Sequence, residues 1–304
     1  MADARVAVKV DGRQLSLSNL DKVLYPESGF TKGEVIDYYT RVAPALLPHI
    51  TDRPATRKRY PNGVEGQSFF EKNAPSHTPD WVRTVTLPSP GSSKDREEVR
   101  YIVIDDLPTL VWLANLAALE LHVPQWSVGP RGRVHDADLL VFDLDPGPPA
   151  TIVECSEVAV LLRDQLAADG LQAWPKTSGS KGLQLYVPIK ETSATRTSEY
   201  AKELAGRLEA DRRDLVVSRM AKQLRPRKVF VDWSQNNAAK TTVAPYSLRA
   251  RALPTVSTPV TWDEVEACRQ GTDDLRFLAH DVLDRLDDRG DLHAPLLELR
   301  QRLP

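Results

Sequence analysis

The chain opens with a regular alternation of apolar and polar residues. In the segment VAVKVDGRQLSLS, residues 6–18, the alternation runs on both sides of Asp11-Gly12. A period of two places apolar side chains on one face of a strand, and Asp-Gly favours a tight turn. The segment therefore predicts a β-hairpin at the start of the fold.

Helical periodicity follows the hairpin. Thr31 and Glu34 have the spacing of a capping box, and apolar residues then recur at helical spacing up to Pro48. This pattern predicts a helix that ends at Pro48. Residues 107–120 are apolar on almost every side, which is typical of a buried helix.

The second half of the chain alternates strands and helices. Residues 151–170 form an amphipathic helical pattern, and a further helix is predicted at residues 195–211. From Thr261, with Glu264 in the spacing of a capping box, we expect a helical end-piece that covers residues 261–304. Predicted strands cover residues 54–60, 81–87, 97–105, 139–147, 171–189 and 228–234.

No repeat or low-complexity linker separates the chain into independent parts. One α+β domain with two lobes, built from antiparallel or mixed sheets flanked by helices and covering residues 1–304, is favoured over two separable domains. A polar loop, SPGSSKDR at residues 89–96, joins two predicted strands. We expect it to be exposed and mobile, and it either bridges two copies of the chain or is merely solvated.

Composition indicates the class of protein. With 304 residues and 41% apolar content, the chain is long enough for a large core, as expected of a soluble enzyme. The N-terminus lacks the pattern of a signal peptide, and no segment approaches the roughly 18 apolar residues of a membrane span. We therefore expect a cytoplasmic protein with no membrane partner. Cys155 and Cys268 suggest neither a disulfide framework nor a zinc site, so any metal must be held by oxygen atoms.

The net charge of -2 argues at first against a nucleic-acid partner. The distribution of the charge changes this picture, because residues 263–304 hold eleven acidic and six basic residues, whereas residues 219–228 hold five basic and no acidic ones. A second basic run lies at residues 52–59. Each run is a candidate nucleic-acid contact, and a solvated face is an equally good interpretation of either.

Two carboxylates end one predicted strand. In VFDLD the strand period places Asp143 and Asp145 on one face, while Phe142 and Leu144 point into the core. Two like charges this close favour a cation, and oxygen ligands suit Mg²⁺ or Mn²⁺. On these residues alone, a plain turn with one Asp capping the next helix is the stronger interpretation.

Asp232 shifts the interpretation from a turn towards a metal site, because it ends another apolar strand, KVFVDWS. Three carboxylates can bridge two metal ions, an arrangement that activates a 3′-hydroxyl and stabilises a leaving pyrophosphate in nucleotidyl transfer. One or two of the three could instead be caps or surface ion pairs.

Candidate phosphate-binding residues lie in TSGSKGLQLY. Ser178, Lys181 and the glycines around them would let backbone N–H groups approach a phosphate, although a glycine hairpin turn also explains them and the spacing is not that of a Walker loop. Polar residues that flank Asp232 in the sequence are suited to phosphate or to surface ion pairs: Arg225, Gln235, Arg249 and Arg251.

Two adjacent phenylalanines follow the first basic run. Phe69 and Phe70 are suited to stacking on a base or sugar beside phosphate-binding cations. Because neighbouring residues of a strand point to opposite faces, we expect one of them in the core and the other exposed.

Taken in order and spacing, LVFDLDPG, TSGSKGLQLY and KVFVDWSQN resemble the polymerase domain of bacterial ligase D, which belongs to the archaeo-eukaryotic primase superfamily. The resemblance covers nearly the whole chain, including NLDKVLYP, RKRYPNG and LELHVPQW. It implies a primase-polymerase fold, two Mn²⁺ or Mg²⁺ ions and a nucleoside triphosphate substrate with a tendency towards ribonucleotides. It also implies action in non-homologous end joining alongside Ku and a ligase.

The same resemblance implies roles for individual residues. The catalytic metals would be bound by Asp143, Asp145 and Asp232. The 5′-phosphate and DNA side would be contacted by Asn19, Lys22, Lys32, Arg59 and Phe69, with these elements mainly in residues 1–120. The nucleotide would be contacted, mainly from a catalytic core at residues 120–260, by Lys58, Phe70, His122, Ser178, Lys181, Gln184, Arg225, Gln235 and Arg249.

One position departs from the family pattern. Gln184 stands where relatives commonly have a His. Gln donates hydrogen bonds but carries no charge, which puts nucleotide affinity and its pH dependence in question. No ligase or phosphoesterase motif occurs up to Pro304, as expected of a stand-alone polymerase or of an excised domain.

We interpret the chain as a bacterial, nucleoid-associated polymerase that extends a primer 3′-end at DNA gaps or broken ends, as a monomer or as a pair across a break. A metal-dependent nuclease would also use clustered Asp, but it would not need Ser178, Lys181 and Arg249. The same residues would also suit a polymerase that primes synthesis or fills gaps in excision repair, or a catalytically weak DNA-end-binding module.

Overall fold

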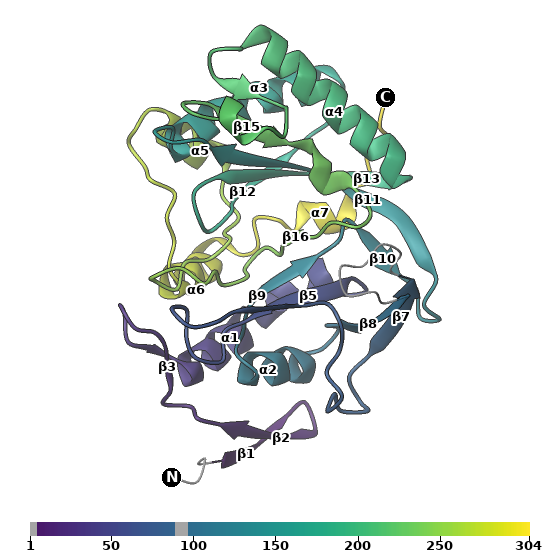
Figure 1. Cartoon of the computed structure of the whole chain (residues 1–304), viewed down its shortest axis with the longest axis vertical. Helices are drawn as coiled ribbons and strands as arrows, with labels where there is room; N and C mark the ends of the chain where they lie inside the picture. The colour runs from purple at the N-terminus through teal and green to yellow at the C-terminus, as the bar shows by residue number, and fades with distance from the viewer. Residues whose placement is uncertain (1–4, 89–96) are drawn as a thin grey trace.

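The computed structural model describes residues 5–88 and 97–304, and in it two six-stranded sheets stand face to face (Figure 1). The upper sheet contains β10 (Trp126–Val128), β11 (Val134–Pro146), β12 (Trp174–Thr177), β13 (Leu183–Thr192), β14 (Val216–Val217) and β15 (Val229–Asp232). The lower sheet contains β5 (Pro54–Arg59), β6 (Phe69–Glu71), β7 (Thr84–Pro88), β8 (Glu98–Val103), β9 (Ala118–Val123) and β16 (Thr242–Val243). Every pair among the strands named in the described residues is antiparallel except β14 with β15, so the expected α+β class with antiparallel and mixed sheets is confirmed.

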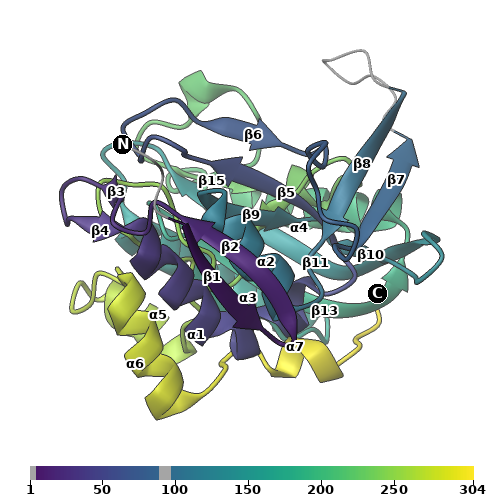
Figure 2. The same ribbon diagram turned by 90° about the horizontal axis from the view of Figure 1, so that it is seen from below.

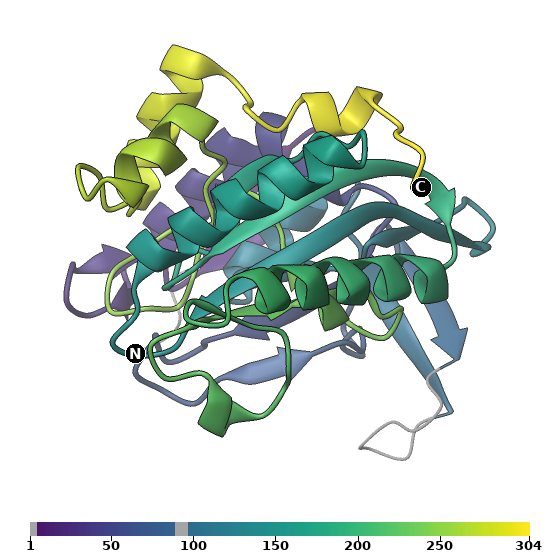
Figure 3. The same cartoon turned by 90° about the horizontal axis from the view of Figure 1, so that it is seen from above.

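Helices cover the outer face of the upper sheet. Figure 3 shows α3 (Ile152–Ala168) and α4 (Ala194–Asp211) lying along this face. Alternate side chains of β11 explain the packing, because Phe142 and Leu144 are fully buried in the same apolar cluster as the two helices. Asp143, between them, therefore points the other way, towards the lower sheet.

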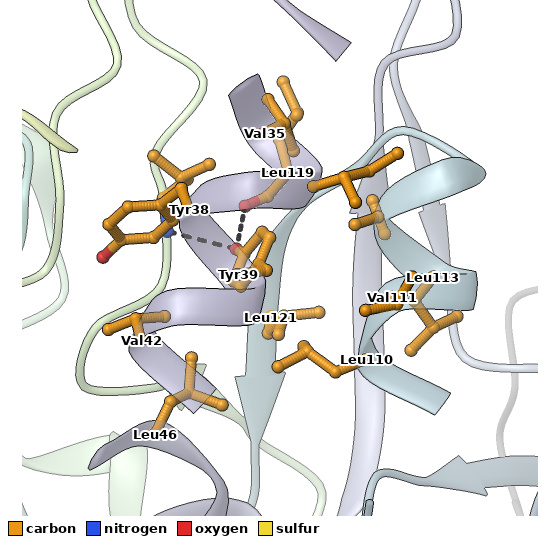
Figure 4. Close-up of a cluster of buried hydrophobic side chains, with 14 of the residues drawn as sticks. Val35, Tyr38, Tyr39, Val42, Leu46, Leu110, Val111, Leu113, Leu119 and Leu121 are labelled. Atoms are coloured by element: carbon orange, nitrogen blue, oxygen red, sulfur yellow. Dashed lines mark hydrogen bonds between the residues drawn. The ribbon is translucent and has the colours of Figure 1, made fainter. Parts of the chain in front are cut away.

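The lower sheet is covered from beneath by α1 (Lys32–Ile50) and α2 (Leu107–Asn115). Their apolar side chains surround Leu119 and Leu121 of β9 (Figure 4). The hydroxyl of Tyr39 donates a hydrogen bond to the backbone oxygen of Leu119 over 2.6 Å and so ties α1 to the sheet. Since Leu119 and Leu121 face the helices, Glu120 and His122 face the upper sheet.

The prediction of one helix over residues 107–120 is wrong. Helix α2 ends at Asn115, Ala117 adopts a left-handed conformation with φ of 56°, and the chain then enters strand β9. A buried helix followed by a buried strand is apolar throughout, and periodicity alone does not separate the two. The helix that starts after Thr31 also continues past Pro48, and its last turn is closed by the Thr51 backbone N–H, which donates to the oxygen of Leu47.

Other expected elements are present. The hairpin consists of β1 (Arg5–Val10) and β2 (Arg13–Ser18), with positive φ angles at Asp11 and Gly12, and Figure 2 shows it on the underside of the molecule beside α2. Capping boxes form at Thr31, Thr151 and Thr261. The end-piece contains α5 (Trp262–Arg269), α6 (Ala279–Arg289) and α7 (Pro295–Glu298). The predicted loop at 89–96 lies outside the described residues.

The two sheets are joined where the chain leaves the upper one. After β15 and a short 3-10 helix (Trp233–Asn236), β16 pairs with β9, so that Val243 lies opposite His122. A short β3–β4 pair (Val23–Tyr25 and Phe30–Thr31) precedes α1. Among the helices in residues 5–88 and 97–304, none has the length and apolar character that crossing a membrane requires.

Candidate active site

The three candidate metal ligands lie on the inner face of the upper sheet. Asp143 of β11 is the register partner of Asp232 of β15, and Asp145 follows two positions along β11 on the same face. Asp232 is buried, Asp143 is half-buried and Asp145 is exposed. Two neighbouring strands thus bring together carboxylates that are far apart in the sequence.

The three carboxylates perturb one another. Burial raises the pKa of Asp143 to about 7, and the nearby charges of Asp145 and Asp232 add to this effect. Burial and the charge of Asp232 also raise the pKa of Asp145, against the opposing influence of Arg225. A divalent cation would relieve this repulsion, and a purely oxygen donor set fits a hard ion such as Mg²⁺ or Mn²⁺.

Asp232 also has protein partners. It caps the 3-10 helix that follows it, accepting hydrogen bonds from the backbone N–H and hydroxyl of Ser234 at 3.0 and 2.5 Å, and from the Gln235 amide at 2.8 Å. Lys240 lies 3.8 Å from the same carboxylate. A metal ion would compete with Ser234, Gln235 and Lys240 for the Asp232 carboxylate. Within the described ranges, no three His, Cys, Asp or Glu side chains are already grouped closely enough to hold a metal ion.

Gln184, the position that departs from the family pattern, lies beside Asp143. Its amide nitrogen donates to Asp143 Oδ1 over 3.0 Å, and its amide oxygen accepts a hydrogen bond from Lys176 Nζ over 2.5 Å. Only 3% of Gln184 is exposed, and Lys176 is fully buried. Both ends of the amide are thus engaged inside the protein.

The turn between β12 and β13 is closed by its own polar groups. The Ser178 hydroxyl accepts hydrogen bonds from the backbone N–H groups of Ser180 and Gly182, at 3.2 and 3.1 Å. A side chain at Gly182 would place Cβ only 1.9 Å from the Leu144 oxygen, so the turn packs directly on the strand of the carboxylates. Lys181 is exposed at the tip of this turn.

Two arginines approach the carboxylates from loops. Arg225 stacks over the ring of Phe230 at 3.7 Å, and its backbone oxygen lies against Gly147, where an added Cβ would be 2.0 Å away. Arg249 spans the two sheets: its Nη1 donates to the Ser178 oxygen over 2.5 Å, and its Nε lies 3.4 Å from Glu120 Oε2.

The inner face of the lower sheet carries the remaining nucleotide-side candidates. Lys58 is the register partner of both Phe70 and Glu120, and the His122 ring lies edge-on to that of Phe70 at 5.9 Å.

Glu120 is 3% exposed and lies 3.0 Å from His122 Nε2. Burial alone would raise the pKa of Glu120, but the hydrogen bond with His122 and the charge of Arg249 outweigh it and lower the pKa to about 2. Burial lowers the pKa of His122, against the opposing effect of Glu120.

The expectation that one of the two phenylalanines is in the core is wrong. Phe69 is 41% exposed and Phe70 is 54% exposed. Among the described strands, β6 has only three residues and pairs with β5 alone, and at this edge of the sheet both phenylalanine side chains stay exposed. Arg59, beside Phe69, pairs with Glu71 at 3.1 Å and donates to the Leu116 oxygen over 2.7 Å.

The candidate 5′-phosphate residues lie together where β2 ends and α1 begins. The Lys22 backbone N–H donates to the Asn19 oxygen, and the Lys32 backbone N–H donates to the Lys22 oxygen. Lys22 is exposed and donates to Asn62 Oδ1 over 3.1 Å, beside a shallow depression that Asn19 also lines. Lys32 is only 6% exposed, and its Nζ contacts Ser18.

Sequence reasoning missed two buried charged residues of the site. Glu120 was hidden in the predicted helix over 107–120. Lys176 stands next to the TSGSK motif in a strand that is otherwise buried, and a lysine at such a position was the available signal.

Comparison with known proteins adds family evidence to this geometry. A family model described as "LigD, primase-polymerase domain" matches residues 31–293. The chain is 47% identical over 285 residues to the multifunctional non-homologous end joining protein LigD of Mycolicibacterium smegmatis, and 32% identical over 279 residues to the bifunctional non-homologous end joining protein LigD of Bacillus subtilis. These alignments cover 93% and 91% of this chain but only 36% and 43% of the relatives, so the chain spans less than half of their length.

A solved structure is similar over almost its whole length. It is the polymerase domain of Mycobacterium tuberculosis ligase D in complex with DNA, with a TM-score of 0.87 and 45% sequence identity. The match covers 93% of this chain and 98% of the other.

Proposed function

Because the chain belongs to the LigD primase-polymerase domain family, a family of DNA-directed nucleotidyltransferases, we propose that it extends the 3′-end of a primer at DNA gaps or broken ends. The observation that carries this proposal is the pairing of Asp143 with Asp232, two strand positions from Asp145. Three carboxylates on one inner face meet the electrostatic demand of nucleotidyl transfer.

Asp143, Asp145 and Asp232 would hold two divalent ions, Mn²⁺ or Mg²⁺. When bound, such ions supply a polarised 3′-hydroxyl and charge stabilisation for the leaving pyrophosphate. The protein itself contributes position: Gly182 packs on the strand of Asp143, and Gln184 donates a hydrogen bond to Asp143, so the carboxylate is fixed before substrates arrive.

The nucleotide would lie between the two sheets. Arg249 joins Ser178 to Glu120 across this space, and Phe70 with His122 forms an exposed aromatic surface beside Lys58. We propose that Phe70 stacks against the incoming nucleotide and that cationic groups approach its phosphates. The residues proposed for the phosphates and sugar are Lys58, His122, Ser178, Lys181, Arg225, Gln235 and Arg249.

The DNA would contact the elements that precede residue 120. Lys22 is exposed beside Asn19, with Lys32 behind it, and Phe69 is exposed beside Arg59. We propose that the first group holds a 5′-phosphate and that Phe69 stacks on the template side. The names of the relatives support a role in non-homologous end joining. We propose that the chain acts there at the nucleoid, alongside Ku and a ligase, as a monomer or as a pair across a break.

Primer extension on a gapped duplex tests this function. The wild-type protein is incubated with the duplex, Mn²⁺ or Mg²⁺ and separate pools of ribo- and deoxynucleotides, and the gap carries either a 5′-phosphate or a 5′-hydroxyl. We expect triphosphate-dependent extension that is stronger on the phosphorylated gap. Shortening of the primer would indicate a nuclease. Binding to the phosphorylated gap without extension would indicate a DNA-end-binding module.

A further inference from the structure

A buried lysine reaches the carboxylates through one intermediate side chain, and this inference rests on the proposed function. We infer that Lys176 is a positioning residue for the metal-binding carboxylate of Asp143, acting through Gln184, and that Gln184 serves the metal site and not the triphosphate. The contacts form one chain, from Lys176 Nζ to Gln184 Oε1 at 2.5 Å and from Gln184 Nε2 to Asp143 Oδ1 at 3.0 Å.

The direction of each hydrogen bond follows from the chemistry of the donors. Asp143 Oδ1 is an acceptor, so Gln184 turns its NH₂ group towards it, and its oxygen accepts from Lys176 Nζ, an amine that has N–H donors in either protonation state. Ser257 fixes the other side of Lys176. Its single hydroxyl hydrogen is donated to the Thr177 oxygen over 2.8 Å, so its oxygen accepts from Lys176 Nζ over 2.5 Å. Lys176 thus selects the amide orientation in which Gln184 presents a donor to an Asp143 oxygen.

Burying these polar side chains lowers the stability of the fold unless each of them has a hydrogen-bond partner. Lys176 and Ser257 have no exposed surface, and Gln184 has almost none. Burial lowers the pKa of Lys176 well below its usual range, against the opposing charge of Asp143, and Nζ lies 5.2 Å from the ring centre of Tyr186. The hydrogen bond from Gln184 then meets Asp143 Oδ1 from a fixed direction, which orients the carboxylate towards a metal ion.

Gln184 has little surface left for a phosphate oxygen. It is the register partner of Asp143 and shares the inner face with it, but only 3% of it is exposed, and its nitrogen and oxygen both have protein partners.

Manganese binding in the absence of nucleotide and DNA tests the inference separately from polymerisation. Mn²⁺ is titrated at pH 7.5 into the wild-type protein and into Lys176→Met, Gln184→Met and the double variant, with free Mn²⁺ read by electron paramagnetic resonance. Lys190→Met is the matched control, since it removes the same charge from an exposed position on β13. Far-UV circular dichroism and the thermal midpoint report folding of each protein.

We expect Lys176→Met and Gln184→Met each to weaken Mn²⁺ binding about tenfold, as for other groups that orient metal ligands. The double variant should bind no more weakly than Gln184→Met, because the lysine acts only through the glutamine. Simple charge repulsion predicts the opposite sign, since loss of a nearby cation would tighten Mn²⁺ binding.

Unchanged or tighter binding by Lys176→Met, or losses that multiply in the double variant, would overturn the inference. If Lys176→Met fails to fold, the comparison of Gln184→Met with the double variant decides, because the double variant replaces both polar partners by apolar ones and leaves neither unpaired. Equal affinities support the inference, and a further loss contradicts it. Absence of Mn²⁺ binding by the wild-type protein would instead contradict the proposed metal site.

Discussion

Asp143 and Asp232 lie directly opposite each other on the antiparallel strands β11 and β15, and both face the lower sheet. Like charges that are opposed in a sheet lower its stability, and here burial strengthens the repulsion. The fold therefore keeps a destabilising pair at its centre, a feature that bound divalent cations would offset.

The isosteric variant Asp143→Asn separates stability from metal binding. Without metal, it should increase the free energy of unfolding by about 1 kcal/mol, because it removes the opposed charge and keeps an oxygen that can accept from Gln184. In the wild-type protein, Mn²⁺ at a hundredfold excess over its dissociation constant should add about 2.7 kcal/mol, and this gain should be absent from the variant. Urea unfolding with and without Mn²⁺ measures both effects. A variant that is less stable than the wild type in EDTA would contradict the repulsion.

Gly182→Ala should damage the site through the backbone. Its Cβ would meet the Leu144 oxygen at 1.9 Å, so β13 and β11 must separate, at a cost of about 3 kcal/mol. Gly206→Ala is the control, since Gly206 lies in α4 with no atom within 4 Å of an added Cβ and should gain about 0.5 kcal/mol from helix propensity. Thermal unfolding of the two variants measures the difference, and equal midpoints would show that the turn is not packed as described.

The sequence predicts local geometry well and long-range geometry poorly. Strand periodicity placed Asp143 and Asp145 on one face and buried Phe142 and Leu144, because that relationship needs only one strand. The pairing of Asp143 with Asp232 depends on sheet register across distant segments, which no period in the chain encodes. A second apolar strand that ends in a carboxylate suggested Asp232 for the same site, and the resemblance to a known family implied it.

Two predictions from the sequence are wrong, each for its own physical reason. The apolar run over 107–120 contains a helix and a strand that are both buried, so its pattern gave no boundary and hid Glu120. Phe69 and Phe70 do point to opposite faces of β6. Alternation buries a side chain only where another layer of the protein packs against that face, and both phenylalanines of this edge strand stay exposed. The buried chain of contacts from Lys176 to Asp143 requires the pairing of β12 with β13 and of β13 with β11, so no single segment of the sequence predicts it.

Glu120→Gln tests the link between the two sheets. Glu120 has a folded-state pKa of about 2 against 4.5 for the free group, so it stabilises the protein above pH 4.5, and this contribution is lost as the pH falls through about 2. The variant should lose on the order of 2 kcal/mol of unfolding free energy at pH 7, and its deficit should shrink between pH 4.5 and pH 2.

The same variant should raise the KM for nucleotide more than it lowers kcat, because Arg249 and His122 both lose the negative charge of their carboxylate partner. Glu65→Gln, at an exposed position, is the control for the loss of one acidic charge. A loss of stability that does not depend on pH, or an unchanged KM for nucleotide, would contradict the assignment of Glu120 as the link between the two sheets.

Phe69 and Phe70 should have separable functions. Phe70→Ala should raise the KM for nucleotide about tenfold, as expected for the loss of one stacking contact. Phe69→Ala should weaken binding of gapped DNA and leave the nucleotide KM unchanged, since its side chain lies on the opposite face of β6 from His122. Steady-state kinetics and fluorescence anisotropy measure the two effects, and identical profiles for both variants would contradict the assignment of the two faces. Both side chains are exposed, so neither change should alter stability by more than about 0.5 kcal/mol.

Single-turnover primer extension by the wild-type and Asp232→Asn proteins tests whether the paired carboxylates catalyse nucleotidyl transfer. Both are mixed with a 5′-phosphorylated gapped duplex, Mn²⁺ and a complementary nucleoside triphosphate, and the extended primer and released pyrophosphate are quantified together. We expect equal yields of extended primer and pyrophosphate from the wild-type protein and a loss of at least a thousandfold in rate for Asp232→Asn, on the order expected when a catalytic group is removed. Extension by Asp232→Asn at the wild-type rate would contradict the assignment of catalysis to the paired carboxylates.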